Sequence, residues 1–171
     1  ISIAVGNYFQ QMEMHAQAEK LLARALALHP QADQAVGIHS ALFHSLVALQ
    51  RYDDAFVAVK EFKRMAKEED LAFAFEVVDD LGAVAGAFVA EENYEDATEA
   101  DMLRLKLSLT REIGRPKHPS VEALEVINST KPHLALGYLK RAMVLDKDNQ
   151  IVKEWFEKLQ SEREESHTMN E

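Results

Sequence analysis

The chain has 171 residues, of which 47 % are apolar, and a formal net charge of −10. This length and composition indicate one globular domain with a sizeable core rather than a disordered chain. The negative charge and the absence of a Lys/Arg-rich run argue against a nucleic-acid partner. The sequence contains no cysteine, which excludes disulfides, thiolate metal sites and a cysteine nucleophile.

The sequence shows no targeting or membrane segment. No apolar run approaches the roughly 18–20 residues of a membrane-spanning helix, and no signal peptide opens the chain. We therefore expect a cytoplasmic protein without membrane insertion. The first residue is Ile rather than Met, so we expect further residues upstream. Four Pro and six Gly are few, and a sequence with so few helix breakers and many Ala, Leu, Glu and Lys favours helices.

Four short segments place an alanine at near-constant spacing. The segment RYDDA ends at Ala55, and the similar NYEDA ends at Ala97. Related segments end at Ala18 and Ala135, so that the spacings are 37, 42 and 38 residues. We call these four alanines the anchors. A small residue at the start of a helix lets a neighbouring helix approach closely, so the spacing predicts a repeated helical unit.

Each anchor begins an amphipathic helix that follows a first helix. Four helix pairs are thus predicted, over residues of about 1–30, 32–67, 71–114 and 118–146. The spacing of i+4 and i+7 after an anchor marks one helix face. After the first, second and fourth anchors these positions hold Leu22, Ala25, Val59, Phe62, Leu139 and Ala142.

The first helix of each pair is indicated by two positions before the anchor. The residues twelve positions before the anchors are Gly6, Phe43, Ala85 and Ala123. The larger residues three positions later are Phe9, Leu46, Phe88 and Val126. We expect both sets to face the second helix of the pair.

The third pair departs from this pattern. Asp101 and Arg104 stand where the other pairs have apolar or small residues. The second helix of this pair also continues through Leu109 before Gly114 stops it.

One further helix is predicted at the end, over about 149–164. Its apolar stripe is Ile151, Val152, Trp155, Phe156 and Leu159, and its opposite face is charged. The last unit of a repeat array needs a polar outer face, so we expect a capping helix with Trp155 in the core. Residues 165–171 have little to bury and are expected to form a mobile tail.

The anchors, together with Gly6, Phe9 and Pro30 of the first pair, resemble the tetratricopeptide repeat over nearly the whole chain. The long third pair resembles the extended repeats of kinesin light chains. The resemblance implies an all-α fold, namely a right-handed superhelical stack of antiparallel helix pairs in a single domain over 1–164. It also implies a non-catalytic protein-interaction module, a scaffold or adaptor, whose first helices line a concave groove.

The register selects candidate residues for this groove. They are Asn7, Gln11, Ser40, His44, Val47, Gly82, Gly86, Val89 and Asn128. The lining lacks the Lys and Arg with which relatives of this family hold acidic chaperone tails. We expect it to bind an extended or helical segment of another protein, mainly through apolar contacts. Asn7, Gln11, His44 and Asn128 would supply hydrogen bonds.

Gly82 and Gly86 raise a separate question, since a glycine inside a helix costs roughly 0.5–1 kcal/mol relative to alanine. Close approach of another backbone would explain them. That backbone belongs either to a ligand or to the neighbouring helix of the same stack, and both explanations stay open here.

No catalytic, cofactor-binding or metal-binding motif is found. Residues 146–157 begin like a calcium loop, but Ile151 stands where that loop needs glycine. Other functions remain open. The chain could be the peptide-sensing domain of a larger regulator or a helper domain of a multidomain enzyme, or it could self-associate through an open first hairpin.

Overall fold

The computed structural model describes residues 12–65, 74–111 and 121–169, together with Gly6. Within these residues all regular structure is α-helical and no strand occurs, which confirms the all-α class. The predicted residues Phe9, Asn7 and Gln11 lie outside them. The chain packs as two compact units, residues 1–87 and 88–171, where the sequence predicted one domain over 1–164.

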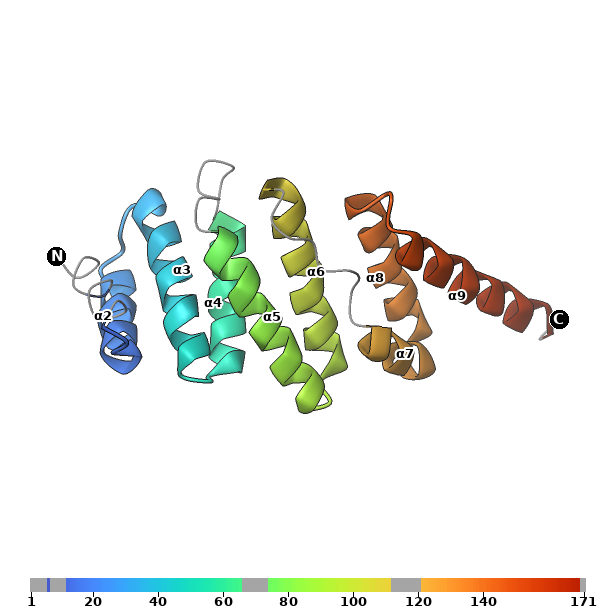
Figure 1. Ribbon diagram of the computed structural model, residues 1–171, viewed down its shortest axis with the longest axis horizontal. Helices are drawn as coiled ribbons and strands as arrows, with labels where there is room; N and C mark the ends of the chain where they lie inside the picture. The colour runs from blue at the N-terminus through green and yellow to red at the C-terminus, as the bar shows by residue number, and fades with distance from the viewer. Residues whose placement is uncertain (1–5, 7–11, 66–73, 112–120, 170–171) are drawn as a thin grey trace. The chain divides into compact units, whose positions relative to one another are not determined.

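Among the described residues of the first unit are three complete helices and most of a fourth. They are α2 (His15–Ala27), α3 (Ala32–Ala48), α4 (Tyr52–Met65) and α5 (Ala74–Ala90), the last of which reaches across the boundary. Helix α3 packs against both α2 and α4 (Figure 1). It buries residues on most of its circumference for this reason.

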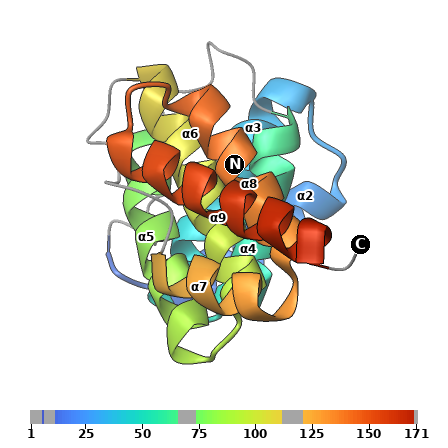
Figure 2. The same cartoon turned by 90° about the vertical axis from the view of Figure 1, so that its right-hand side faces the viewer.

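The second unit continues with four helices. They are α6 (Tyr94–Arg111), α7 (Val121–Thr130), α8 (Pro132–Leu145) and α9 (Gln150–Met169). Helix α8 is central in this unit, because it packs against α6, α7 and α9. Figure 2 shows α9 in front of α8, with α7 below both.

The four anchors occupy the same place in four helices. The side chains of Ala18, Ala55, Ala97 and Ala135 are all 0 % exposed. The backbone N–H of each anchor donates to the carbonyl of the residue directly before its helix, at 3.1, 2.9, 3.1 and 3.4 Å in chain order. The apolar residues at i+4 and i+7 are buried as predicted. The repeated spacing of the sequence therefore corresponds to a repeated local structure.

The turns of the second and third pairs are also equivalent. Gln50 and Glu92, five residues before their anchors, have φ values of 59° and 60°. The next residue donates its N–H across the turn, from Arg51 to the Leu46 carbonyl and from Asn93 to the Phe88 carbonyl, each at 2.9 Å. Many helices end in this way, with one residue in the left-handed conformation and the N–H of the next residue bonded to a carbonyl five residues earlier.

The turn of the fourth pair differs and corrects one prediction. Three residues separate α3 from α4 and α5 from α6, but only Lys131 separates α7 from α8. Val126, predicted to face the second helix, is 36 % exposed, and Ile127 is buried in its place. The prediction for Val126 was wrong because the short connection shifts the buried face of α7 by one residue.

The second helix of the third pair is long. The two residues that depart from the repeat pattern, Asp101 and Arg104, lie near its middle. Helix α6 has 18 residues, whereas α4 and α8 have 14 each. Asp101 is buried, and its Oδ1 lies 3.8 Å from Nη1 of Arg104. The expected stop at Gly114 lies outside the described residues.

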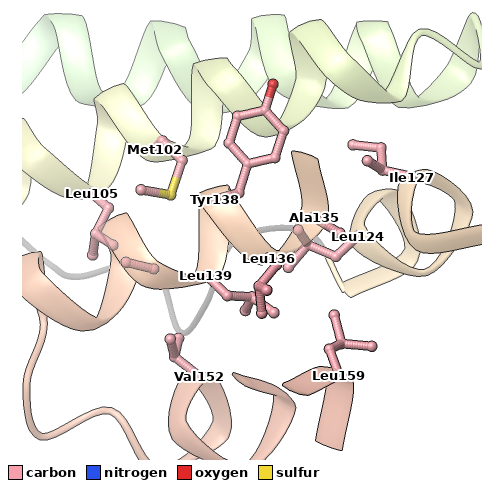
Figure 3. Packing of buried hydrophobic residues seen from close by; sticks show 11 residues of the cluster. Met102, Leu105, Leu124, Ile127, Ala135, Leu136, Tyr138, Leu139, Val152 and Leu159 are labelled. Carbon is pink, nitrogen blue, oxygen red and sulfur yellow. The ribbon is translucent and has the colours of Figure 1, made fainter. Parts of the chain in front are cut away.

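Helix α9 is longer than predicted. It continues to Met169, so residues 165–169 of the expected tail form its last helical residues. Val152 and Leu159 are buried, and Trp155 is half-buried against the same cluster. Figure 3 shows Val152 and Leu159 of α9 directed toward Leu136 and Leu139 of α8.

Candidate functional site

A hydrogen bond joins the first helices of the second and third pairs inside the first unit. The Nδ1 atom of His44 on α3 lies 2.7 Å from Oδ2 of Asp80 on α5. The His44 side chain is 40 % exposed and that of Asp80 is 17 % exposed. The bond shows that α3 and α5, which carry several of the predicted groove residues, lie next to each other. We call the residues His44, Val47, Gly82, Ala83 and Gly86 the α3–α5 face.

Most of the predicted groove residues in this unit lie at the surface. Val47 and Gly82 are half-buried, and Gly86 is exposed, as is the neighbouring Ala83. Ser40 is the exception, because only 5 % of it is exposed. It is buried on α3 as Phe43 is, so little of its surface could contact a ligand, in contrast to the position that the sequence predicted for it.

Gly6 and Gly86 have opposite surroundings. A Cβ at Gly6 would lie 3.0 Å from Cδ2 of the buried Leu22. A Cβ at Gly86 would meet no atom within 4 Å in the part of the chain that the structure describes. Close packing of a neighbouring helix therefore explains glycine at position 6. It does not explain glycine at position 86.

A second histidine stands beside the α3–α5 face. The ring of His15, the first residue of α2, meets the ring of His44 edge-on, with 5.6 Å between centroids and 71° between planes. The Nδ1 atom of His15 is buried and makes no hydrogen bond. On the same helix as His44, burial lowers the pKa of His39, while the Glu61 carboxylate raises it by a smaller amount.

Two of the predicted groove residues, Val89 and Asn128, belong to the second unit. Val89 is half-buried in the last turn of α5. Asn128 on α7 lines a hollow of about 230 Å³, together with Pro132 of α8 and five residues of α9. The sequence predicted Leu159 in the apolar stripe of α9, but it placed Glu162 and Arg163 on the charged outer face and Ser166 and His167 in the tail. The helical spacing of three and four residues, continued from Leu159, reaches Glu162 and would have indicated this side of α9.

The described residues offer little for metal chemistry. No group of three His, Asp or Glu side chains among them could hold a metal ion. The segment that begins like a calcium loop is a helix cap, because Oδ1 of Asn149 accepts a hydrogen bond from the Val152 N–H at 3.3 Å. Helix α9 begins at the next residue.

Comparison with known proteins leaves the chain without an assigned family: no family model, no curated protein and no solved structure matches it. Among the helices that the structure describes, none has the length and apolar character needed to cross a membrane. The functional argument therefore depends on the residues themselves.

Proposed function

We propose that the chain is a protein-interaction module of tetratricopeptide type and that its α3–α5 face binds a segment of a partner protein. The buried anchors and the repeated turns support the repeat. In such arrays the first helix of each pair supplies the binding surface, and α3 and α5 are the first helices of their pairs.

The observation that carries the proposal is the open space at Gly86. A helical glycine weakens its helix by roughly 0.5–1 kcal/mol relative to alanine, and no atom of the described chain would obstruct a Cβ atom there. The backbone of a bound segment would need this space. Binding would then depend on the missing side chain, although folding does not.

The chemistry of the face fits a mainly apolar contact with few polar anchors. Val47 and Ala83 offer small apolar surfaces, and His44 offers a partly exposed ring held in place by Asp80. Peptides that bind along helical surfaces combine apolar side-chain contacts with a few hydrogen bonds that set their register. His44 is the residue of this face that would set the register.

A pair of glycine substitutions tests the proposal. Gly137 on α8 provides a matched control, since a Cβ added there also meets no atom within 4 Å of it in the described chain. We expect Gly86→Leu and Gly137→Leu both to keep the helical content and to unfold at a Tm no lower than that of the unaltered chain, because leucine is a better helix former than glycine. In affinity capture from a lysate of the source organism, only Gly86→Leu should lose the proteins that the unaltered chain retains. Equal retention by the two variants would contradict the proposal.

A further inference from the structure

One face of α9 changes halfway along the helix, from buried apolar residues to exposed polar ones. Its first half is apolar, with Val152 and Leu159 buried against α8. The positions that continue the same stripe beyond Leu159, at i+3, i+4 and i+7, are Glu162, Arg163 and Ser166. Because these positions share one helix face, polar groups extend a face whose first half packs on the core.

These polar side chains meet a hollow instead of a packed neighbour. The hollow has a volume of about 230 Å³, and its lining includes two apolar residues, the buried Leu159 and the exposed Pro132. Asn128 of α7 also lines it, together with Glu162, Arg163, Ser166 and His167 of α9. The site lies wholly within the second unit and shares no residue with the α3–α5 face.

The polar groups around the hollow have no partners of their own. Within the described part of the chain, the side chains of Asn128, Glu162, Arg163, Ser166 and His167 make no hydrogen bond or ion pair with one another or with other residues. Their neighbours do make such bonds. Thr168, for example, donates to the Glu164 carbonyl at 3.0 Å. The groups at the hollow are thus free to bind a ligand.

The size and charge of the hollow define the ligand. It is larger than a cavity of about 150 Å³, which holds benzene, and smaller than the roughly 300 Å³ at which ordinary small-molecule sites begin. Glu162 and Arg163 give the lining both signs of charge, so a purely anionic or purely cationic ligand would meet one like charge. A small zwitterion with an apolar side chain matches the volume, the two apolar lining residues and both charges.

We propose that this hollow binds a free α-amino acid with a large aliphatic or aromatic side chain. The ligand's carboxylate accepts hydrogen bonds from Arg163, its ammonium group donates to Glu162, and its side chain rests on Leu159 and Pro132. Charge-assisted hydrogen bonds of this kind are the stronger ones in proteins. Asn128 and Ser166 supply the remaining donors and acceptors.

The test is a titration of the whole chain with L-leucine, followed by ¹⁵N–¹H NMR. We expect saturable shifts of the backbone amides of Asn128, Glu162 and Arg163. L-leucinamide lacks the carboxylate and glycine lacks the side chain, and each should bind at least about tenfold more weakly than L-leucine. The absence of saturable shifts with L-leucine would overturn the proposal.

Two further arms separate this ligand from other sources of the same chemistry. N-acetyl-L-leucine imitates the last residue of a peptide, because it keeps the carboxylate and loses the ammonium charge. Binding equal to that of L-leucine would assign the hollow to a peptide terminus and overturn the proposal. Arg163→Gln and Glu162→Gln should each weaken L-leucine about tenfold, whereas Lys153→Gln and Glu164→Gln, on the same helix outside the lining, should not. An unchanged affinity in Arg163→Gln would also overturn it.

This outcome is independent of the proposed protein-interaction function. The Gly86→Leu variant changes the first unit only and should bind L-leucine as the unaltered chain does. Loss of the amino-acid site with retained partner capture, or the reverse, would show which of the two assignments fails.

Discussion

Gly6 lies so close to Leu22 that an added Cβ would stand 3.0 Å from its Cδ2 atom. The Leu22 side chain is 0 % exposed and cannot move aside without disturbing the packing around Ala18 and Ala25. At Gly86 the same added atom would meet nothing within 4 Å in the described chain. The two glycines therefore serve different purposes.

Alanine substitutions at these glycines should change stability in opposite directions. Gly86→Ala should raise the free energy of unfolding by about 0.5–1 kcal/mol, because alanine is the better helix former. Gly6→Ala should lower it by about 1 kcal/mol or more, since overpacking outweighs the helical gain. Urea denaturation monitored by circular dichroism measures both. A loss of stability in Gly86→Ala would show that another part of the chain occupies the space beside it.

The equivalent turns of the second and third pairs allow a second stability test. Gln50 and Glu92 adopt left-handed backbone conformations, with φ of 59° and 60°, which cost a residue with a side chain about 1 kcal/mol. Gln50→Gly and Glu92→Gly should each raise the free energy of unfolding by about 0.5–1 kcal/mol, after the greater freedom of glycine in the unfolded chain is subtracted.

Alanine serves as the control at the same positions. Gln50→Ala keeps the Cβ atom and should gain nothing, because the strain comes from that atom. Thermal unfolding of the unaltered chain, Gln50→Gly, Glu92→Gly and Gln50→Ala, measured in parallel, tests the prediction. If the glycine and alanine variants of one turn melted at the same temperature, the turn would not have the left-handed conformation described above.

The hydrogen bond between His44 and Asp80 should couple α3 to α5. A double-mutant cycle of His44→Ala and Asp80→Ala isolates this coupling from the other contacts of each residue. Because the His44 side chain is 40 % exposed, solvent weakens the interaction, and we expect a coupling of about 0.5–1 kcal/mol. Additive effects of the two substitutions would indicate that the helices are not held together at this point.

His39 should make stability depend on pH. Burial is the main cause that lowers the pKa of His39 below 6.5. The unfolded chain then binds more protons than the folded one between the folded pKa and 6.5, so the free energy of unfolding rises with pH through this window. It falls as the pH is lowered through the same window, because protonation then favours the unfolded state.

The His39→Gln variant tests this dependence directly. Its free energy of unfolding should fall less than that of the unaltered chain between about pH 7.5 and pH 5, since one titrating group is gone. His133→Gln, at an exposed position of α8, controls for the general effect of replacing a histidine. A difference between His39→Gln and the unaltered chain that stays constant over this range would contradict the prediction.

The helix pattern was predictable from sequence because its signals are local. A small residue at a helix crossing and apolar residues at i+4 and i+7 stay in one short segment, so the four anchors and the stripes that follow three of them were found correctly. The shift from Val126 to Ile127 was not predictable, because it depends on a connection of one residue between α7 and α8. A stripe of residues does not show the length of the following turn.

The candidate site was less predictable than the fold. Ser40 has a polar side chain at a groove position, yet it is buried because α3 packs on both sides. Asp80 was missed since its pairing with His44 joins residues 36 positions apart. The hollow beside Asn128 depends on α9 continuing beyond residue 164, and the charged sequence there gives no local sign of what it faces.

The most direct test of the interaction role is hydrogen exchange of the whole chain with and without a captured partner. Amides in the last turns of α3, near His44 and Val47, and in α5 around Gly86 should exchange more slowly in the complex. This result would place the partner on the α3–α5 face. Protection confined to other helices, with α3 and α5 unchanged, would contradict the account.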